Sequence, residues 1–232
     1  MTLGSVGKAS TDQFAGARKL MLVPLVMAVH DESEFVELVN RYWNEAGQQV
    51  RNLESGLGRI AHVFHEGTVD EGEAGLTALE RGAAPSFPLV KEVWGRGAQV
   101  QAVEETETLL ETLDLQRCLL VAQASTTVGQ RLYEWYTAAR KRRYETMIQR
   151  IRGALQEDEV GLLVIGQDHQ LQFPPDIQVF YVAPPSLNDI DRWLRDHPGP
   201  QQPSESDGAT SASGQSEGRE AGDEGQGEEA ST

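Results

Sequence analysis

Histidines stand beside several of the apolar runs that the sequence predicts as strands. His30, His65 and His169 each come within four residues after the end of such a run. In an open parallel sheet the carboxyl ends of the strands are where ligands bind. Imidazole suits both metal binding and proton transfer near neutral pH. The pattern therefore predicts one site to which distant parts of the chain contribute.

Carboxylates accompany these histidines. Glu66 directly follows His65, and Glu104 comes at the end of another predicted strand. Two imidazoles and one carboxylate can hold a divalent metal ion and lower the pKa of its bound water toward ~7. We therefore expect His30, Glu66 and His169 as ligands of a divalent metal whose identity the sequence leaves open. Without a metal, the same groups can act as general acid and base.

Two arginines lie near the middle of the strongest predicted helix, at residues 127–156. Arg143 belongs to its apolar stripe, and Arg140 lies beside that stripe. A guanidinium group can bind a substrate carboxylate or phosphate, or stabilise an oxyanion. The predicted catalytic residues are His30, Glu66, His169 and Arg143, and the predicted substrate-binding residues are His65, Glu104 and Arg140.

Each candidate also has a purely structural interpretation. His30 can form a local hydrogen bond where a helix begins, and His65-Glu66 can be a solvated strand end. Glu104 can favour the positive N-terminus of the next helix. The basic run 140–143 can be an exposed helix face. Common catalytic motifs do not decide the matter, because the chain has no P-loop, no dinucleotide-binding glycine motif and no nucleophile-elbow serine motif.

Strand patterns alternate with helix patterns along the chain. Residues 20–30 are apolar enough for a strand buried on both faces. Asp31 and Glu34 then form a predicted capping box, before apolar residues recur at three- and four-residue spacing up to residue 53. Such long crossovers suit parallel strands, so we expect an α/β fold with a mostly parallel sheet flanked by helices. Further strands are predicted at 60–64, 98–103, 160–165 and 176–183; further helices at 73–81, 86–95, 105–113 and from 186 onward; residues 115–122 fit a strand or a buried helix.

The composition divides the chain into three parts. Residues 1–19 are a predicted flexible leader, and residues 20–197 a single α/β domain. Residues 198–232 contain eight acidic residues and one arginine, hence a charge of −7 out of −16 for the whole chain, and no large apolar residue. Such a segment buries too little apolar surface to offset its ordering entropy, so we expect a disordered acidic tail.

The chain shows the features of a cytoplasmic protein. Cys118 is the only cysteine, so no internal disulfide forms, and its apolar neighbours predict a buried thiol. The run 20–29 is also compatible with a cleaved signal segment, but Pro24 and the acidic residues that follow favour a core strand. No apolar run approaches the ~18 residues that a spanning helix needs.

One part of the sequence resembles a known superfamily. Arg143-x-x-x-Met147-x-x-x-Ile151, followed by a strand and Gly166-x-x-His169, resembles the C-terminal core of the TraB/ChaN/erythromycin-esterase-like superfamily. This resemblance implies an α/β fold with a cleft of histidine, glutamate and arginine that is sometimes metal-dependent. The roles proposed within that superfamily include esterases, peptidase-like, haem-binding and regulatory proteins.

The first half of the chain is similar to the same superfamily at three strand ends. His30 follows the first predicted strand, Glu66 the second and Glu104 the third. The leading hypothesis is thus a hydrolase-like protein that acts on a small-molecule or peptide substrate with an anionic or carbonyl group. The alternative is a non-enzymatic small-molecule-binding or regulatory protein that uses the same cleft. The remaining charge of −9 on residues 1–197 argues against nucleic acid as a partner, and the oligomeric state stays open.

Overall fold

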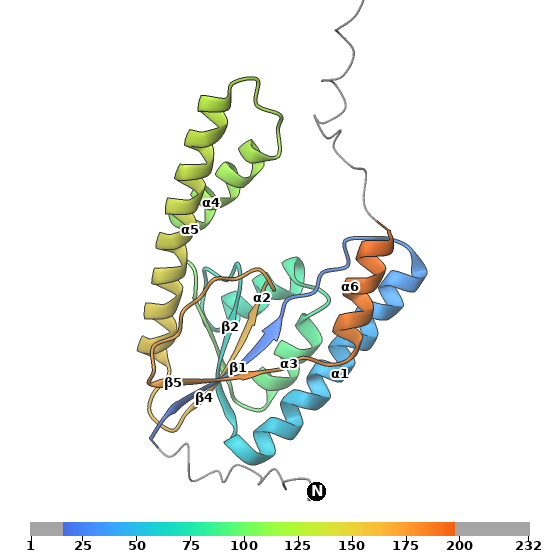
Figure 1. Cartoon of the computed structure of the whole chain (residues 1–232). Coiled ribbons are helices and arrows are strands. Elements are labelled where there is room, and N and C mark those ends of the chain that lie inside the picture. The colour runs from blue at the N-terminus through green and yellow to red at the C-terminus, as the bar shows by residue number, and fades with distance from the viewer. Residues whose placement is uncertain (1–15, 198–232) are drawn as a thin grey trace, which may run out of the picture. The chain divides into compact units, whose positions relative to one another are not determined.

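Five strands and six helices make up the computed structural model, which describes residues 16–197 (Figure 1). The predicted acidic tail and residues 1–15 of the predicted leader lie outside these described residues. The strands are β1 Arg18–Pro24, β2 Ile60–His65, β3 Gln99–Gln101, β4 Val160–Ile165 and β5 Ile177–Tyr181; the helices are α1 Ser33–Leu57, α2 Gly72–Gly82, α3 Phe87–Gly95, α4 Thr106–Leu119, α5 Thr126–Ala154 and α6 Ser186–Asp196.

The five strands form one parallel sheet in the order β3-β2-β4-β1-β5. All six residues of β4 are buried, as are six of the seven residues of β1. Strands covered on both faces need continuous apolar sequence rather than alternation, which is what these two runs supply. The predicted α/β fold with a mostly parallel sheet is confirmed.

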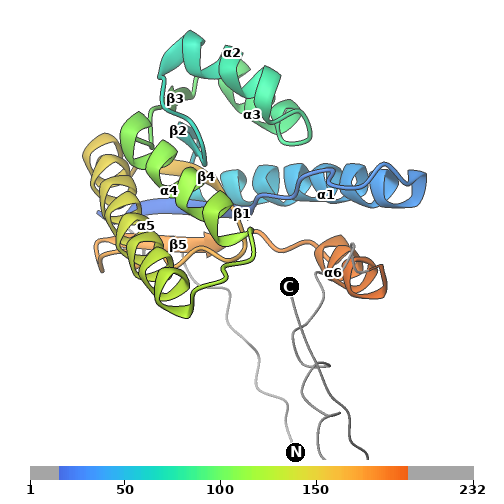
Figure 2. The same ribbon diagram turned by 90° about the horizontal axis from the view of Figure 1, so that it is seen from above.

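Helices cover the two faces of the sheet, each over its own hydrophobic core. On one face, α1, α3 and α6 pack through residues such as Phe35, Val90 and Ile190. On the other face, α5 packs through its C-terminal half, where Met147 and Ile151 are fully buried. Figure 2 shows α5 on the opposite side of the sheet from α1 and α6. The N-terminal half of α5 pairs with α4 and extends beyond the sheet (Figure 1).

Two local predictions are wrong. The first strand ends at Pro24 rather than near residue 30, and residues 27–29 are exposed in the loop that follows. Pro24 lacks the N–H that would continue the ladder, which fits an end at this residue. The helix after this loop begins at Ser33, and its N-cap residue Glu32 makes no side-chain cap, so the capping box of Asp31 and Glu34 is absent.

The run 115–122 belongs to neither predicted alternative. Its first residues complete α4, and the rest form a turn before α5. Cys118 is exposed on α4, so the prediction of a buried thiol is wrong. No other element of the described chain covers this part of α4, so its apolar side chains are not buried. The apolar composition of the run does not show whether another element covers it. Among the described residues, no helix combines the length and apolar character required to cross a bilayer.

Close packing of α2 against the sheet gives a testable prediction. A Cβ atom at Gly75 would collide with the main-chain oxygen of Asp70 and lie 2.9 Å from Cγ1 of Val100. We expect Gly75→Ala to lower the free energy of unfolding by about 1–3 kcal/mol in urea denaturation. Gly82, in the same helix, has no atom within 4 Å of an added Cβ. Gly82→Ala is therefore the control, and an equal loss in both variants would contradict the packing described.

Candidate functional site

The chain leaves the neighbouring strands β1 and β4 toward different parts of the molecule. The loop after β1 leads to α1 on one face, whereas the segment after β4 adds Leu171 and Phe173 to the core on the other face. In doubly wound sheets, ligands bind where adjacent strands diverge in this way.

Three predicted site residues meet at this edge of the sheet in a buried ion cluster. Glu66 follows β2, Glu104 follows β3, and Arg143 comes from the middle of α5. The Arg143 Nε atom lies 2.9 Å from Glu104 Oε2 and 3.1 Å from Oε1, while Nη2 donates to Glu104 Oε1 and, over 2.9 Å, to Glu66 Oε1. The Glu104 side chain has no exposed surface, and that of Arg143 is 9% exposed.

The cluster keeps Arg143 charged. Burial disfavours the charged guanidinium, but Glu104 and then Glu66 outweigh it and raise the pKa of Arg143. Arg150 reinforces the arrangement, because its Nη1 donates to the main-chain oxygens of Ala102 and Glu104 at 3.1 and 2.7 Å. Arg143 therefore joins α5 to the ends of two strands through its Nε and Nη2 groups.

Glu66 connects the cluster to the loop after β4. Its second oxygen, Oε2, accepts the main-chain N–H of Gly166 at 2.8 Å. A Cβ atom at Gly166 would lie 3.2 Å from this oxygen and 3.1 Å from Oδ1 of Asp168. The two carboxylates thus approach the main chain closely at a position where glycine leaves room. The ion cluster in this way sets the start of the loop that carries His169.

His169 is held in a defined orientation by that loop. Its N–H bonds to the main-chain oxygen of Gly166 at 3.2 Å, and its Nδ1 accepts the N–H of Leu171 at 3.3 Å. Since Nδ1 is an acceptor, the neutral ring carries its proton on Nε2. Burial lowers the pKa of His169, and the charges of Glu66 and Asp168 oppose this only in part. His169 is accordingly a neutral hydrogen-bond donor near pH 7.

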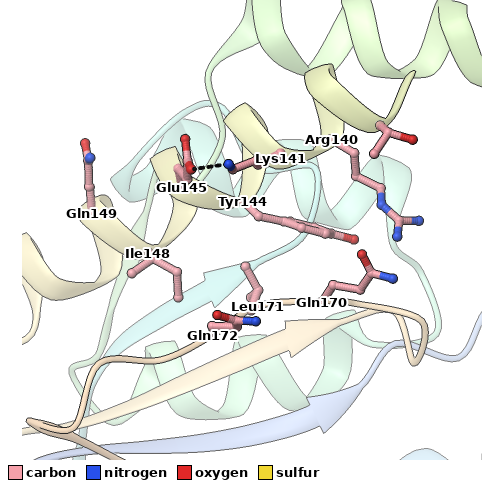
Figure 3. A pocket seen from close by; sticks show the side chains of 10 residues that line it. Arg140, Lys141, Tyr144, Glu145, Ile148, Gln149, Gln170, Leu171 and Gln172 are labelled. Atoms are coloured by element: carbon pink, nitrogen blue, oxygen red, sulfur yellow. Dashed lines mark ion pairs between the residues drawn. The ribbon is translucent and has the colours of Figure 1, made fainter. Parts of the chain in front are cut away.

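A cavity of about 820 Å³ lies between α5 and the segment that follows His169 (Figure 3). We call it the α5 groove. Tyr144 and Leu171 give it an apolar floor, and Arg140 and Gln170 place polar groups at its edge. The remaining lining residues are Thr137, Lys141, Glu145, Ile148, Gln149 and Gln172.

Arg140 is the cation of this groove that is open to a ligand. Its guanidinium lies 5.6 Å from the ring centroid of Tyr136 and 5.8 Å from that of Tyr144, which is cation–π geometry. Within residues 16–197, no carboxylate lies at ion-pair distance from Arg140, whereas Lys141 faces Glu145 at 3.9 Å. Burial raises the pKa of Tyr144; Arg140 and, less strongly, Arg143 oppose this rise, whereas Glu66 and Asp168 add to it. Tyr144 therefore connects the groove electrostatically with the ion cluster.

His65 occupies a buried position of its own. Its Nδ1 lies 2.7 Å from the main-chain oxygen of Glu66, and its Nε2 lies 2.9 Å from Oγ of Ser86. Both side chains are buried, and neither lines the α5 groove. The structure thus gives His65 contacts with α3 and the protein main chain, where the sequence predicted contact with substrate.

His30 lies on the other side of the sheet from α5. Its ring packs edge-on against Phe35 and Trp193, with centroids 5.3 and 5.0 Å apart, and its Nδ1 is 3.6 Å from Glu32. In the described part of the chain, no three His, Cys, Asp or Glu side chains are placed to hold a metal ion. The groups predicted as metal ligands, His30, Glu66 and His169, do not form a fitting set here, and a metal site stays a prediction.

Sequence reasoning missed Tyr144 and Gln170, and it named Gly166 only as part of the Gly166-x-x-His169 motif. Tyr144 stands four residues after Arg140, a spacing that places two side chains on the same helix face. That spacing was a usable signal. The facing segment 170–172 has no regular secondary structure, so no periodicity could have assigned it.

Comparisons with protein-family models, with curated proteins and with solved structures gave no match. The resemblance to the TraB/ChaN/erythromycin-esterase-like superfamily therefore stays a prediction.

The buried ion cluster predicts a strong effect on stability. Arg143→Met leaves the carboxylate of Glu104 buried without its partner, and we expect a loss of about 3–5 kcal/mol in the free energy of unfolding. Arg142→Met is the matched control, because Arg142 is exposed on the same helix as Arg143 and pairs with Glu111 of α4. Such surface pairs contribute at most about 1 kcal/mol. Similar losses in the two variants, measured by denaturant titration, would show that the cluster adds no more than a surface pair.

Burial of His65 predicts a pH dependence of stability. Burial lowers the pKa of His65 below its ordinary value of 6.5, with the nearby Glu66 opposing in part. Below that pH the unfolded chain binds a proton that the folded protein does not, so stability falls as the pH drops from 7 to 5. In His65→Asn the decline should be shallower, by up to about 1.4 kcal/mol per pH unit. An unchanged slope would contradict a neutral, buried His65.

Proposed function

We propose that the protein is a hydrolase-like enzyme whose substrate, a small molecule or peptide with an anionic group and a carbonyl group, binds in the α5 groove. One observation carries this proposal. A neutral, oriented His169 precedes the groove-lining segment, and Arg140 stands across the same groove without a carboxylate partner among the described residues.

Arg140 binds the anionic group of the substrate. Its guanidinium is restrained between two tyrosine rings, so little conformational entropy is lost when a carboxylate or phosphate forms a two-pronged hydrogen bond. Tyr144 and Leu171 offer apolar surface to the rest of the substrate, and the amide of Gln170 is a donor and acceptor for polar groups.

Asp168 transfers the proton, and the neighbouring His169 stabilises the developing negative charge. Asp168 is exposed on the loop and is the base that takes a proton from water, whose oxygen then attacks the substrate carbonyl. His169 donates a hydrogen bond from Nε2 to the carbonyl oxygen, on which negative charge develops. Asp168 then passes the proton that it took from water to the oxygen or nitrogen that departs. No step uses a metal, because the predicted ligand set is not assembled. Glu66, Glu104 and Arg143 act as positioning residues through Gly166.

A second candidate is a binding protein that does not turn its ligand over. The engagement of Arg143 and of both Glu66 oxygens favours it, because these groups are then structural and leave only His169 and Asp168 for chemistry. The two candidates share the groove and the Arg140 anchor. They differ only in what His169 does.

A screen with ester, peptide and phosphoester substrates tests the proposal. With an active substrate, His169→Asn should lower kcat about 10²–10³-fold, the usual contribution of a hydrogen-bond donor to a developing oxyanion. Arg140→Gln should mainly raise KM, because it removes binding to an unreacting anionic group. Arg142→Gln, whose pair with Glu111 lies outside the groove, is the control and should leave both constants unchanged.

Turnover that His169→Asn leaves intact would contradict the proposed chemistry. Activity that disappears on dialysis against a chelator and returns with a divalent ion would replace it with the metal mechanism of the sequence prediction. A ligand that raises the melting temperature of the wild type but not of Arg140→Gln, without turnover, would favour the binding protein.

A further inference from the structure

The helices α4 and α5 extend beyond the sheet (Figure 1). Several large apolar side chains are exposed on this part of the chain. We call residues 106–138 the arm. Thr112 is the only buried residue of the arm. Of the nine large hydrophobic side chains that are exposed in the described residues, six belong to the arm: Leu110, Leu120, Val121, Val128, Tyr133 and Trp135. Such a concentration marks a surface that another molecule covers.

One stripe of the arm has the spacing of a helix-pairing seam. Val128, Arg131, Trp135 and Ala138 follow one another at intervals of three, four and three residues, and all are exposed. This is the a/d spacing of a coiled coil. The stripe is separate from the buried and half-buried stripe Leu132, Ala139, Arg143 and Met147 on the same helix.

We infer that the arm is a homodimer contact, in which α5 of one copy packs antiparallel against α5 of a second copy. A two-fold axis near Tyr133 places Arg131 opposite Trp135 of the second copy and Val128 opposite its Ala138. Each pair then occurs twice. The larger Val128 meets the small Ala138, and the guanidinium of Arg131 stacks on an indole ring, a favourable cation–π contact. Arg131 forms no ion pair within residues 16–197 that this contact would break.

The charges of the arm favour a second copy over other occupants. The four acidic and two basic residues of the arm leave it a charge of −2, compared with −16 for the whole chain, and in the paired stretch of α5, residues 126–138, Arg131 and Glu134 cancel. Two copies therefore meet without repulsion along this stretch. An anionic membrane or a nucleic acid, in contrast, finds no excess of positive charge there. The inference does not depend on the proposed function, since none of Val128, Arg131, Trp135 and Ala138 lines the α5 groove.

The oligomeric state of the full chain tests the contact. Sedimentation velocity should show a concentration-dependent monomer–dimer equilibrium at about 1–100 µM. Trp135→Glu should raise the dissociation constant about 100-fold or more, because a central tryptophan commonly dominates such an interface. Tyr181→Glu is the control: this aromatic side chain is 66% exposed on the edge strand β5, outside the arm. It should leave the equilibrium unchanged.

Cysteine crosslinking tests the orientation. In a Cys118→Ser background, Val128→Cys combined with Ala138→Cys should form disulfide-linked dimers on oxidation, and neither single variant should. Crosslinking by Val128→Cys alone would show a parallel contact and overturn the model. A monomer at every concentration, a dimer weakened by Tyr181→Glu instead of Trp135→Glu, or a monomer that sediments with phosphatidylcholine vesicles through Trp135 would overturn the homodimer itself.

Discussion

A single buried guanidinium, Arg143 between two carboxylates, is the constraint on which the site depends. It joins the long helix α5 to the ends of β2 and β3 through Glu66 and Glu104. Removing two charges from water is costly, and only close geometry with further hydrogen bonds offsets that cost. The main-chain N–H groups of Gly67 and Gly166 supply such bonds to the two carboxylates. The hydrogen bonds that offset the cost of burying these charges therefore also hold the loops after β2 and β4 at the carboxyl edge of the sheet.

Two arginines of α5 have different surroundings: one belongs to the buried ion cluster and the other lines the α5 groove. Arg143 faces the sheet and is consumed by the cluster, whereas Arg140, almost one turn earlier, is turned toward the groove and its tyrosines. Glu66 takes part in both regions, because one oxygen belongs to Arg143 and the other to the loop of His169. The ion cluster therefore lies directly beside the loop of His169. For this reason the same pattern of strand-end residues predicted both the cluster residues and His169 as parts of one site.

The sequence predicts the fold and part of the site for identifiable reasons. Continuous apolar runs such as 160–165 have few alternatives to buried parallel strands, and strand-end residues such as Glu66 and Glu104 then share one edge. The prediction that His30 lies at the same edge fails because β1 ends at Pro24, six residues earlier. The loop after Pro24 places His30 against Trp193 of α6. The contact between His65 and Ser86 depends on how α3 packs, which no local pattern contains.

The central claim is that Arg143 and Glu104 stabilise the fold as a coupled pair. A double-mutant cycle measures this most directly, from the free energies of unfolding of the wild type, Arg143→Met, Glu104→Gln and the double variant. Each single variant leaves one partner buried alone, so the double variant should lose less stability than the sum of the two by about 2 kcal/mol or more. Losses that add to within about 0.5 kcal/mol would contradict the coupling and, with it, this description of the site.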